Sequence, residues 1–307
     1  MIHEIPLERR TLHGHFSREL EPIAEIDSGD TIAFGCLDAG WHTRPGEAKF
    51  EPRDEHLDAG HALIGPVAVR GATKGDVLEV AIGALRVGDF GFTVAGGWSS
   101  WLNDRLAVAG GDDHLLRWSL DADAGVARDD RGHEVDLHPF LGVMGMPPEK
   151  RGIHSTSPPR ASGGNIDCKE LVAGTTLLLP IPVDGALFSA GDGHGRQGDG
   201  EVSGTAIECP VERAELTLSV RRDVQLRRPA ARTPDAWITF GFDVDLDDAA
   251  AQALDGMLDL MHREHGLDRR DALALASVVV DVRVTQLVNG VLGVHAVLPH
   301  DAIRISS

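Results

Sequence analysis

The chain has no long hydrophobic run, only three cysteines and no tyrosine. No apolar stretch approaches the roughly 20 residues that a membrane-spanning helix needs, and the first residues do not show the charged-then-apolar order of a secretory signal. Cys36, Cys168 and Cys209 are widely spaced and odd in number, which excludes a disulfide framework and a zinc-ribbon spacing. We therefore expect a cytoplasmic protein that has no membrane partner.

Basic residues are also in the minority. The sequence has 48 acidic residues against 29 lysines and arginines, so its formal net charge is −19. A nucleic-acid surface needs a basic stripe that neutralises phosphates, and we therefore expect no nucleic-acid partner. Most of this charge is expected to form an ordinary acidic surface, although an acidic site that attracts a metal cation stays open as an alternative.

Glycine and proline are abundant, with 36 and 16 residues, and they separate short runs rich in Val, Ile and Leu. This pattern is typical of β-strands joined by turns. Strands are predicted over residues 31–37, 77–82 and 214–220, and residues 128–132 resemble a hairpin loop. There is no repeat of fixed period and no alternation of strand and helix along the chain.

Helix signals are concentrated near the C-terminus. Residues 250–261 carry an apolar stripe at helical spacing, preceded by several Asp residues and followed by the stop signal Gly266. Asp268 is expected to cap a second, short helix that runs to Ala276, and the alternating valines of 278–284 predict a strand. The fold class is therefore mostly β, a sandwich-like or barrel-like body. We expect a catalytic body over residues 1–220 and a helix-containing α+β unit over 221–307 that completes the same fold.

The most informative segment is glycine-rich and acidic. Between Gly191 and Gly200 every second or third residue is glycine, which excludes a regular helix and is too interrupted for a plain strand, so a shaped loop is predicted. The segment and its flank also carry acidic and imidazole groups with a single nearby countercharge, in the order Asp192, His194, Arg196, Asp199 and Glu201. Clustered carboxylates repel unless a cation or hydrogen-bond donors lie among them.

Two carboxylates and an imidazole are suitable ligands for a divalent metal with open coordination positions. Such a metal polarises an amide carbonyl and lowers the pKa of its bound water to about 7, and a remaining carboxylate then acts as general base. The alternative is that Asp and Gly merely form turns here. The spacing matches no specific metal motif, and no strand–loop–helix unit follows that would support a dinucleotide fold.

Asp192 and His194 are the first candidates for metal ligands, because alternate residues of an extended segment point to the same side. Asp38, at the end of a predicted strand, is the third candidate ligand. For His194 the alternative is a hydrogen-bonded loop histidine, and for Asp38 it is a turn residue. Glu201 is the candidate general base, or else a salt-bridge partner of Arg160 or Arg196.

Asn165 and Asp167 follow a glycine pair and are candidate catalytic residues that orient the amide or a ligand, unless they only form an Asx-type turn. His61, Gly164 and Gly193 are the candidate substrate-binding residues, although His61 also fits an ordinary polar loop histidine.

Two arrangements of nucleophilic residues are not supported. One class of amidase uses Cys, Lys and Glu together, and this chain contains Cys168-Lys169-Glu170. Neighbouring residues of an extended chain point to opposite faces, so these three side chains cannot converge on one substrate atom, and Cys168 is expected to be a small buried residue. No Gly-x-Ser-x-Gly elbow accompanies the serines at 155–162.

Several strings resemble the acetamidase/formamidase family. They are Gly-Gly-Asn-Ile-Asp at 163–167, Leu-Pro-Ile-Pro-Val at 179–183, and above all Ala-Leu-Phe-Ser-Ala-Gly-Asp-Gly-His-Gly-Arg-Gln-Gly-Asp-Gly-Glu-Val-Ser-Gly-Thr-Ala-Ile-Glu at 186–208. The likeness extends along nearly the whole chain and includes residues 61–67, 138–145 and 281–289.

This resemblance implies a largely β fold, a small amide substrate such as formamide or acetamide, and a homo-oligomer, a dimer or larger. It also implies hydrolysis to a carboxylate and ammonia by metal-assisted attack of water. Carboxylate and imidazole ligands suit zinc as the divalent cation, and an oxygen-only second site would suit calcium. Departures occur at His61, where family members often have Asn, at Met146, and in the Trp98–Trp101 loop. The alternatives are therefore a larger or substituted amide, or a binding protein with a degenerate site.

Overall fold

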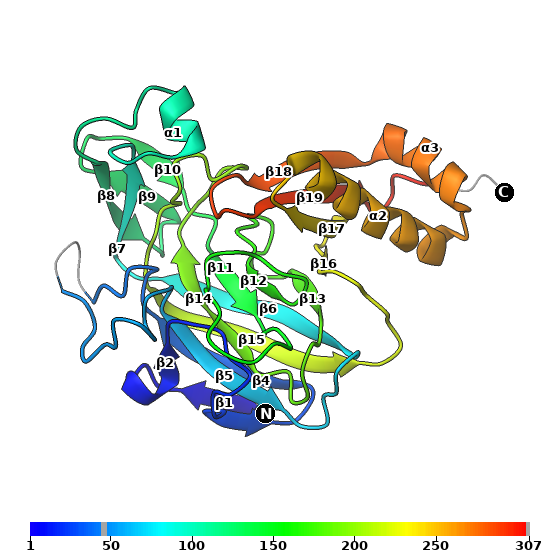
Figure 1. Cartoon of the computed structure of the whole chain (residues 1–307), viewed down its shortest axis with the longest axis horizontal. Helices are drawn as coiled ribbons and strands as arrows, with labels where there is room; N and C mark the ends of the chain where they lie inside the picture. Colours follow the sequence, from blue (N-terminus) through cyan, green and yellow to red (C-terminus); the bar gives the residue numbers. More distant parts are fainter. Residues whose placement is uncertain (44–47, 305–307) are drawn as a thin grey trace.

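The computed structural model describes residues 1–43 and 48–304, and two large sheets form its body (Figure 1). The first sheet has nine strands, which in spatial order are β1 (Ile2–Ile5), β4 (Asp30–Cys36), β15 (Val211–Arg221), β6 (Val77–Val87), β13 (Thr176–Pro180), β16 (Ala230–Arg232), β17 (Ala236–Asp243), β19 (Leu292–Pro299) and β18 (Asp281–Gln286).

The second sheet has six strands. Five follow the order β12 (Gly163–Asn165), β11 (Phe140–Gly145), β14 (Phe188–His194), β5 (Leu63–Val69) and β2 (Leu12–His13), and β3 (Ala24–Ile26) pairs with β5. One hydrophobic core contains side chains of both large sheets, including Phe34 and Leu216 from the first and Phe188 and Leu141 from the second. The mostly β, sandwich-like prediction is therefore confirmed, and the predicted strands of 31–37, 77–82 and 214–220 correspond to β4, β6 and β15.

A smaller four-stranded sheet contains the predicted hairpin. Its order is β10 (Glu134–Asp136), β9 (Val126–Asp129), β8 (His114–Asp121) and β7 (Phe90–Ala95). β9 and β10 pair around the turn at residues 130–133, which confirms the hairpin. The short helices η1 (Arg9–Thr11) and α1 (Trp101–Arg105) lie in connections, and α1 begins in the Trp98–Trp101 loop.

The two C-terminal helices are α2 (Leu246–His265) and α3 (Arg269–Val279). Asp245 caps α2 by accepting hydrogen bonds from the backbone N–H groups of the first turn, and Gly266 ends it at φ 68°, a left-handed conformation that glycine adopts without strain. The predicted boundaries of this helix are confirmed. Asp268 caps α3 as expected.

The strand predicted from Val278 was wrong at its start. Val278 and Val279 belong to α3, and β18 begins only at Asp281. Once the Asp268 cap has nucleated the helix, each further residue adds a backbone hydrogen bond, and the N–H of Val280 still donates to the carbonyl of Ala276. Valine alternation alone did not reveal where this helix ends.

The C-terminal segment continues the large sheet. β16 pairs with β13 of the body, β17 with β16, and β19 with β17, while α2 packs on β17 and β19 around a core of its own. Figure 1 shows the two helices at one end of the molecule. The division of the chain at residue 220 stays a prediction. The strand pairing supports the expectation that residues 221–307 complete the same fold as the body.

The β18–β19 hairpin reaches back to the body. The N–H of Gly200 donates to the carbonyl of Thr285, and the N–H of Leu287 donates to the carbonyl of Gly200. The indole N–H of Trp101 donates to the carbonyl of Leu287 at 3.1 Å. The connection between β18 and β19 is thereby held against the acidic segment. Among the described residues, no helix is long and apolar enough to cross a membrane.

Candidate active site

Asp192 and His194 lie on β14, at the centre of the six-stranded sheet. The expectation of a loop was wrong for residues 191–194, because β11 and β5 pair with β14 on either side. Glycine is what permits this packing: a Cβ on Gly193 would lie 2.4 Å from the carbonyl oxygen of Cys209. The irregular part of the segment starts at Gly195.

The strand is nevertheless distorted at Asp192, whose φ is 61°. Asp167 and Glu201 also have positive φ values, 52° and 45°. A non-glycine residue in this region is uncommon, and strained residues of this kind gather at functional sites where the surrounding structure enforces them. Three of the candidate residues predicted from the sequence are therefore held in conformations that cost free energy.

Gly142 on β11 lies in the middle of this group. A Cβ at this position would lie 2.5 Å from Asp192 Oδ2, 2.7 Å from Asp167 Oδ1 and 2.9 Å from His194 Cε1. The carbonyl of Gly142 also accepts a hydrogen bond from the N–H of Asp167, at 3.3 Å. Only glycine leaves room for the two carboxylates and the imidazole to meet over this strand.

Glu208 joins the group from the chain segment that pairs with the end of β14. Residues 194 and 208 form an isolated antiparallel bridge. His194 Nε2 lies 3.4 Å from Glu208 Oε2 and 3.5 Å from Asp192 Oδ1. The side chains of these three residues are almost completely buried.

Two sets of side chains could hold a metal ion here, and they share His194. One is Asp192, His194 and Glu208, and the other is Asp167, His194 and Glu201; within each set the ligand atoms lie within 4.8 Å of one another. Two ligands bound to one ion at about 2.0–2.2 Å are roughly 3.0–3.6 Å apart, so the first set is already close to a metal geometry.

The hydrogen bonding of the cluster is incomplete in a way that fits a cation. Buried atoms with no hydrogen-bond partner among the described residues are Asp167 Oδ1, Asp192 Oδ1, Glu201 Oε2, Glu208 Oε2 and His194 Nδ1. Buried polar atoms are nearly always satisfied, because an unsatisfied one costs about 1–3 kcal/mol. A divalent cation would satisfy the orphaned oxygens together, so these residues fit a metal.

Burial and mutual repulsion perturb the carboxyl groups. Burial, together with the charges of Asp192 and Glu208, raises the pKa of Asp167 to about 8. Burial and the neighbouring Asp167 raise the pKa of Glu201 well above its usual value, and burial and Asp192 raise that of Glu208. The cluster in this form therefore retains protons that a bound cation would displace.

Asp192 and His194 form the ionised pair of the cluster. Burial opposes the charge of Asp192, but His194 and then His61 outweigh it and lower the pKa of Asp192. Burial likewise disfavours an imidazolium at His194, but Glu208 and Asp192 outweigh it and raise its pKa well above the usual value. One imidazole thus offsets part of the charge of four carboxyl groups.

A cavity of about 400 Å³ opens onto this cluster, and Asp192, Glu201 and Glu208 line it. Asn165 lies in the same wall, and its buried Oδ1 has no hydrogen-bond partner. His61 also lines the cavity: its Nδ1 is 2.7 Å from Thr156 Oγ1, and its Nε2 is 3.9 Å from Asp192 Oδ2. The structure therefore brings together Asn165, Asp167, Asp192, His194 and Glu201, with His61 in the wall of the same cavity.

Three other candidates are not part of this group. Asp38 is buried, but its carboxylate accepts from the N–H of His42 at 2.9 Å and lies beside the ring of His42, outside both sets of candidate ligands. Gly193 faces Cys209, away from the cavity. Gly164, at φ 95°, places the backbone that carries Asn165 and is not among the described residues that line the cavity.

Sequence reasoning missed Glu208, Gly142, Asn289 and Gln197. Asn289, in the β18–β19 connection, donates from Nδ2 to Asp167 Oδ2 at 2.6 Å, and Gln197 donates to the carbonyl of Asp167 at 2.7 Å. Glu208 closes the 186–208 string and could have been found there as a third carboxylate. Asn289 closes the family-like string 281–289, but only the long-range pairing of β18 and β19 with the body reveals that it reaches Asp167.

Known proteins were compared once this geometry was established. The model of the acetamidase/formamidase family matches residues 3–155 and 149–303. The acetamidase of Bacillus halodurans has a solved structure that is 28% identical, with a TM-score of 0.83 and coverage of 96% of this chain and 97% of that one. A recombinant Thermoanaerobacter tengcongensis protein, described as a predicted acetamidase/formamidase, is 25% identical, with a TM-score of 0.85 and coverage of 97% and 96%.

The acetamidase of Mycolicibacterium smegmatis is 25% identical over 250 residues, which cover 62% of this chain and 61% of that protein.

Replacing Gly142 by Ala is expected to weaken binding of Zn²⁺ by at least about 10-fold, a loss typical of disturbed ligand positions. The added Cβ meets the ends of Asp192, Asp167 and His194 rather than backbone, so the fold is retained while the ligands are displaced. Isothermal titration and circular dichroism measure the two effects. Gly198→Ala, which meets nothing within 4 Å, is the control; equal affinity in both variants would contradict the assignment.

The metal-free protein is expected to lose stability between pH 6.5 and about pH 8. Asp167 has a pKa of about 8 when folded against 3.8 ordinarily, so its stabilising contribution is full below pH 3.8 and is lost as the pH rises to about 8. The raised pKa of His194 likewise makes the folded protein less stable as the pH rises. His13, whose pKa falls from 6.5 to about 4 on burial, acts oppositely but only below pH 6.5.

Thermal unfolding of the chelated protein measures this loss, and Zn²⁺ added at the higher pH is expected to reverse it. Asp167→Asn should show a shallower pH dependence. A melting temperature that rises over this interval would contradict the charge assignment.

Proposed function

Because the chain belongs to the acetamidase/formamidase family, it is an amide hydrolase, and we propose that it cleaves a small linear amide to a carboxylate and ammonia with the help of a divalent cation. The observation that supports the cation most directly is the set of orphaned oxygens around His194. We propose Asp192, His194 and Glu208 as its ligands, and zinc as the first choice of metal, since carboxylate and imidazole donors with an open position suit it.

When bound, such a cation polarises the amide carbonyl and acidifies a water molecule. The chain's own groups would then position the reactants. Asn165 Oδ1 is free to accept an N–H of the substrate amide, which holds the carbonyl carbon over the cluster. Asn289 fixes Asp167 Oδ2 and leaves Oδ1 directed at the site, beside Gly142.

Glu201 is proposed as the general base. Its Oε2 is buried, has no hydrogen-bond partner and belongs to the wall of the cavity. It would take a proton from the attacking water and return it to the amide nitrogen, so that the C–N bond breaks and ammonia leaves. The strained backbone at Glu201 supports this role, because it holds the carboxylate in one place during both transfers.

The cavity favours a second substrate class. Formamide and acetamide have three and four heavy atoms, whereas about 400 Å³ falls within the range of pockets that bind much larger ligands. A larger or substituted amide is therefore the second candidate substrate.

Three further expectations rest on indirect support. An exposed edge strand, β18, and apolar side chains on α3 and β18 such as Val278 and Val282 support a homo-oligomer. Three free cysteines support a reducing compartment such as the cytoplasm. For calcium at a second site, the Asp167 and Glu201 oxygens are the donors of suitable chemistry.

Removal of the metal is expected to abolish ammonia release from formamide, acetamide and longer amides, and Zn²⁺ is expected to restore it. Rates are measured before chelation, after chelation and after addition of zinc or calcium, with metal content determined on each sample. Full activity in a protein shown to be metal-free would contradict the metal-assisted mechanism. The amide with the highest kcat/KM decides between the two substrate classes.

Glu201→Gln is expected to lower kcat by about 10²–10⁴-fold with little change in KM, because it removes a proton acceptor and keeps the size of the side chain. Asp199→Asn is the matched control, since Asp199 belongs to the same segment but pairs with Lys169 at 2.8 Å. If Glu201→Ala and His194→Ala both left amide turnover unchanged, the site would be misplaced.

A further inference from the structure

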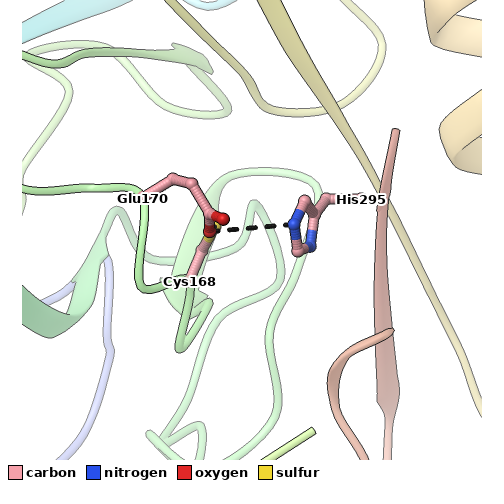
Figure 2. A group of neighbouring side chains, drawn as sticks. All are labelled: Cys168, Glu170 and His295. Atoms are coloured by element: carbon pink, nitrogen blue, oxygen red, sulfur yellow. Dashed lines mark hydrogen bonds and ion pairs between the residues drawn. The ribbon is translucent and has the colours of Figure 1, made fainter. Parts of the chain in front are cut away.

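A second cluster of ligand-type side chains lies where the body meets the C-terminal unit. Figure 2 shows its three members, Cys168, Glu170 and His295, directed toward one another. Cys168 and Glu170 follow Asp167 in the body, whereas His295 comes from β19. Cys168 Sγ donates to Glu170 Oε2 at 3.3 Å, and His295 Nε2 lies 3.7 Å from the same oxygen.

The local backbone explains why Cys168 and Glu170 meet. Lys169, between them, pairs with Asp199 at 2.8 Å. Residues 169 and 170 lie in a turn rather than in an extended segment, and the N–H of Leu171 donates to the carbonyl of Cys168 at 3.0 Å. This turn brings the thiol and the carboxylate together. The ammonium of Lys169 is engaged by Asp199 and is not one of the three ligand groups.

The imidazole of His295 is oriented as a ligand. Its Nδ1 lies 2.8 Å from Thr285 Oγ1, and its buried Nε2 has no hydrogen-bond partner among the described residues. A proton on Nδ1, donated to the threonine hydroxyl, leaves the Nε2 lone pair directed at the cluster. Metal-binding histidines are held by a partner on the other ring nitrogen in this way.

Glu170 is held in a similar manner. Arg283 Nη1 donates to Oε1 at 3.1 Å, which leaves Oε2 facing the thiol and the imidazole. Glu170 and His295 are therefore each held by a residue of β18, Arg283 and Thr285 respectively. Neither partner contacts Glu170 Oε2 or His295 Nε2, the atoms that meet in the cluster.

A nucleophilic role for Cys168 does not fit the structure. Its side chain is completely buried, and among the described residues it is not one that lines the cavity beside Glu201. A nucleophile must reach its substrate, so the thiol, the carboxylate and the imidazole are better explained as ligands.

We propose that Cys168 Sγ, Glu170 Oε2 and His295 Nε2 bind a thiophilic divalent cation of the zinc type, at a site distinct from the amide-hydrolysing cluster. In a tetrahedral zinc site with Zn–S of about 2.3 Å and Zn–N or Zn–O of about 2.0–2.1 Å, the ligand atoms are about 3.3–3.6 Å apart. The distances to Glu170 Oε2, 3.3 Å from Cys168 Sγ and 3.7 Å from His295 Nε2, are close to these separations.

Charge and access are also suitable. A thiolate and a carboxylate neutralise a dication, so the occupied site would be uncharged inside the protein. On binding, the cation replaces the thiol proton, which leaves to solvent. The side chain of Glu170 is 18% exposed, so the cluster is not sealed from solvent on this side.

The site would act as a clamp between segments that are distant in sequence. It ties residues 168–170 of the body to β19, and its supporting groups Arg283 and Thr285 lie on β18. The connection between these two strands carries Asn289, which holds Asp167. The cation is thus placed to hold together the parts that assemble the hydrolytic site. The proposal does not depend on amide hydrolysis itself.

Crystals grown with ZnCl₂ and measured at the zinc absorption edge test the site directly. The expected anomalous peak lies within about 2.5 Å of all three ligand atoms, and Cys168→Ser removes it. Any peak at Asp192, His194 and Glu208 is separate and is judged independently. The control variant Cys36→Ala, at another buried cysteine, should keep the peak.

Cobalt(II) binding in solution provides the second readout. A thiolate-to-cobalt absorption band is expected in the wild type, because neither set of candidate ligands around His194 contains sulfur. Cys168→Ser should lose the band, and Cys36→Ala should retain it. If Cys168→Ser does not fold, Glu170→Gln at the partly exposed position should weaken cobalt binding at this site by at least about 100-fold.

Zn²⁺ should also raise the melting temperature of the wild type more than that of Glu170→Gln. Absence of both the anomalous peak and the cobalt band at saturating metal would overturn the proposal, as would a band that survives in Cys168→Ser.

Discussion

The site depends on one electrostatic constraint, the gathering of four carboxyl groups around one buried imidazole. Burial alone drives carboxylates toward their neutral form, and their mutual repulsion adds to this effect. Such a cluster persists only where the backbone gives the side chains no alternative. The fold meets this requirement with three strained acidic residues and with Gly142, whose missing side chain is the space in which the carboxylates meet.

Sheet continuity explains how distant segments supply the cluster. β14 carries Asp192 and His194 between β11 and β5, and Glu208 bridges back to the end of β14. The large sheet runs from the body into the C-terminal unit, which fixes β18 and β19 and brings Asn289 onto Asp167. The C-terminal unit is therefore part of the site, although it contributes no carboxylate to it.

A feature can be predicted from the sequence when the interactions that create it join residues that are close together in the chain. Helix α2 was predictable because Asp245 and Gly266 act on their own turn, and the pair Asp192 and His194 because alternation along a strand is local. The strand at 191–194 was missed since its pairing partners lie elsewhere in the chain and rescue a glycine-rich segment. Asp38 was expected to meet the 192–194 segment because it ends a predicted strand, whereas local sequence does not show that its carboxylate contacts the backbone N–H and the ring of His42.

The peptide from Asp167 to Glu170 shows how closely the two clusters are connected. Asp167 faces the hydrolytic cluster, and the next residue, Cys168, faces the opposite side toward His295. The positive φ of Asp167 leaves few alternative backbone conformations at the residue that joins the two clusters. Rigid support of this kind preorganises a reactive group at the cost of local strain. A bound cation at Cys168 would therefore fix the position of Asp167 without touching the substrate.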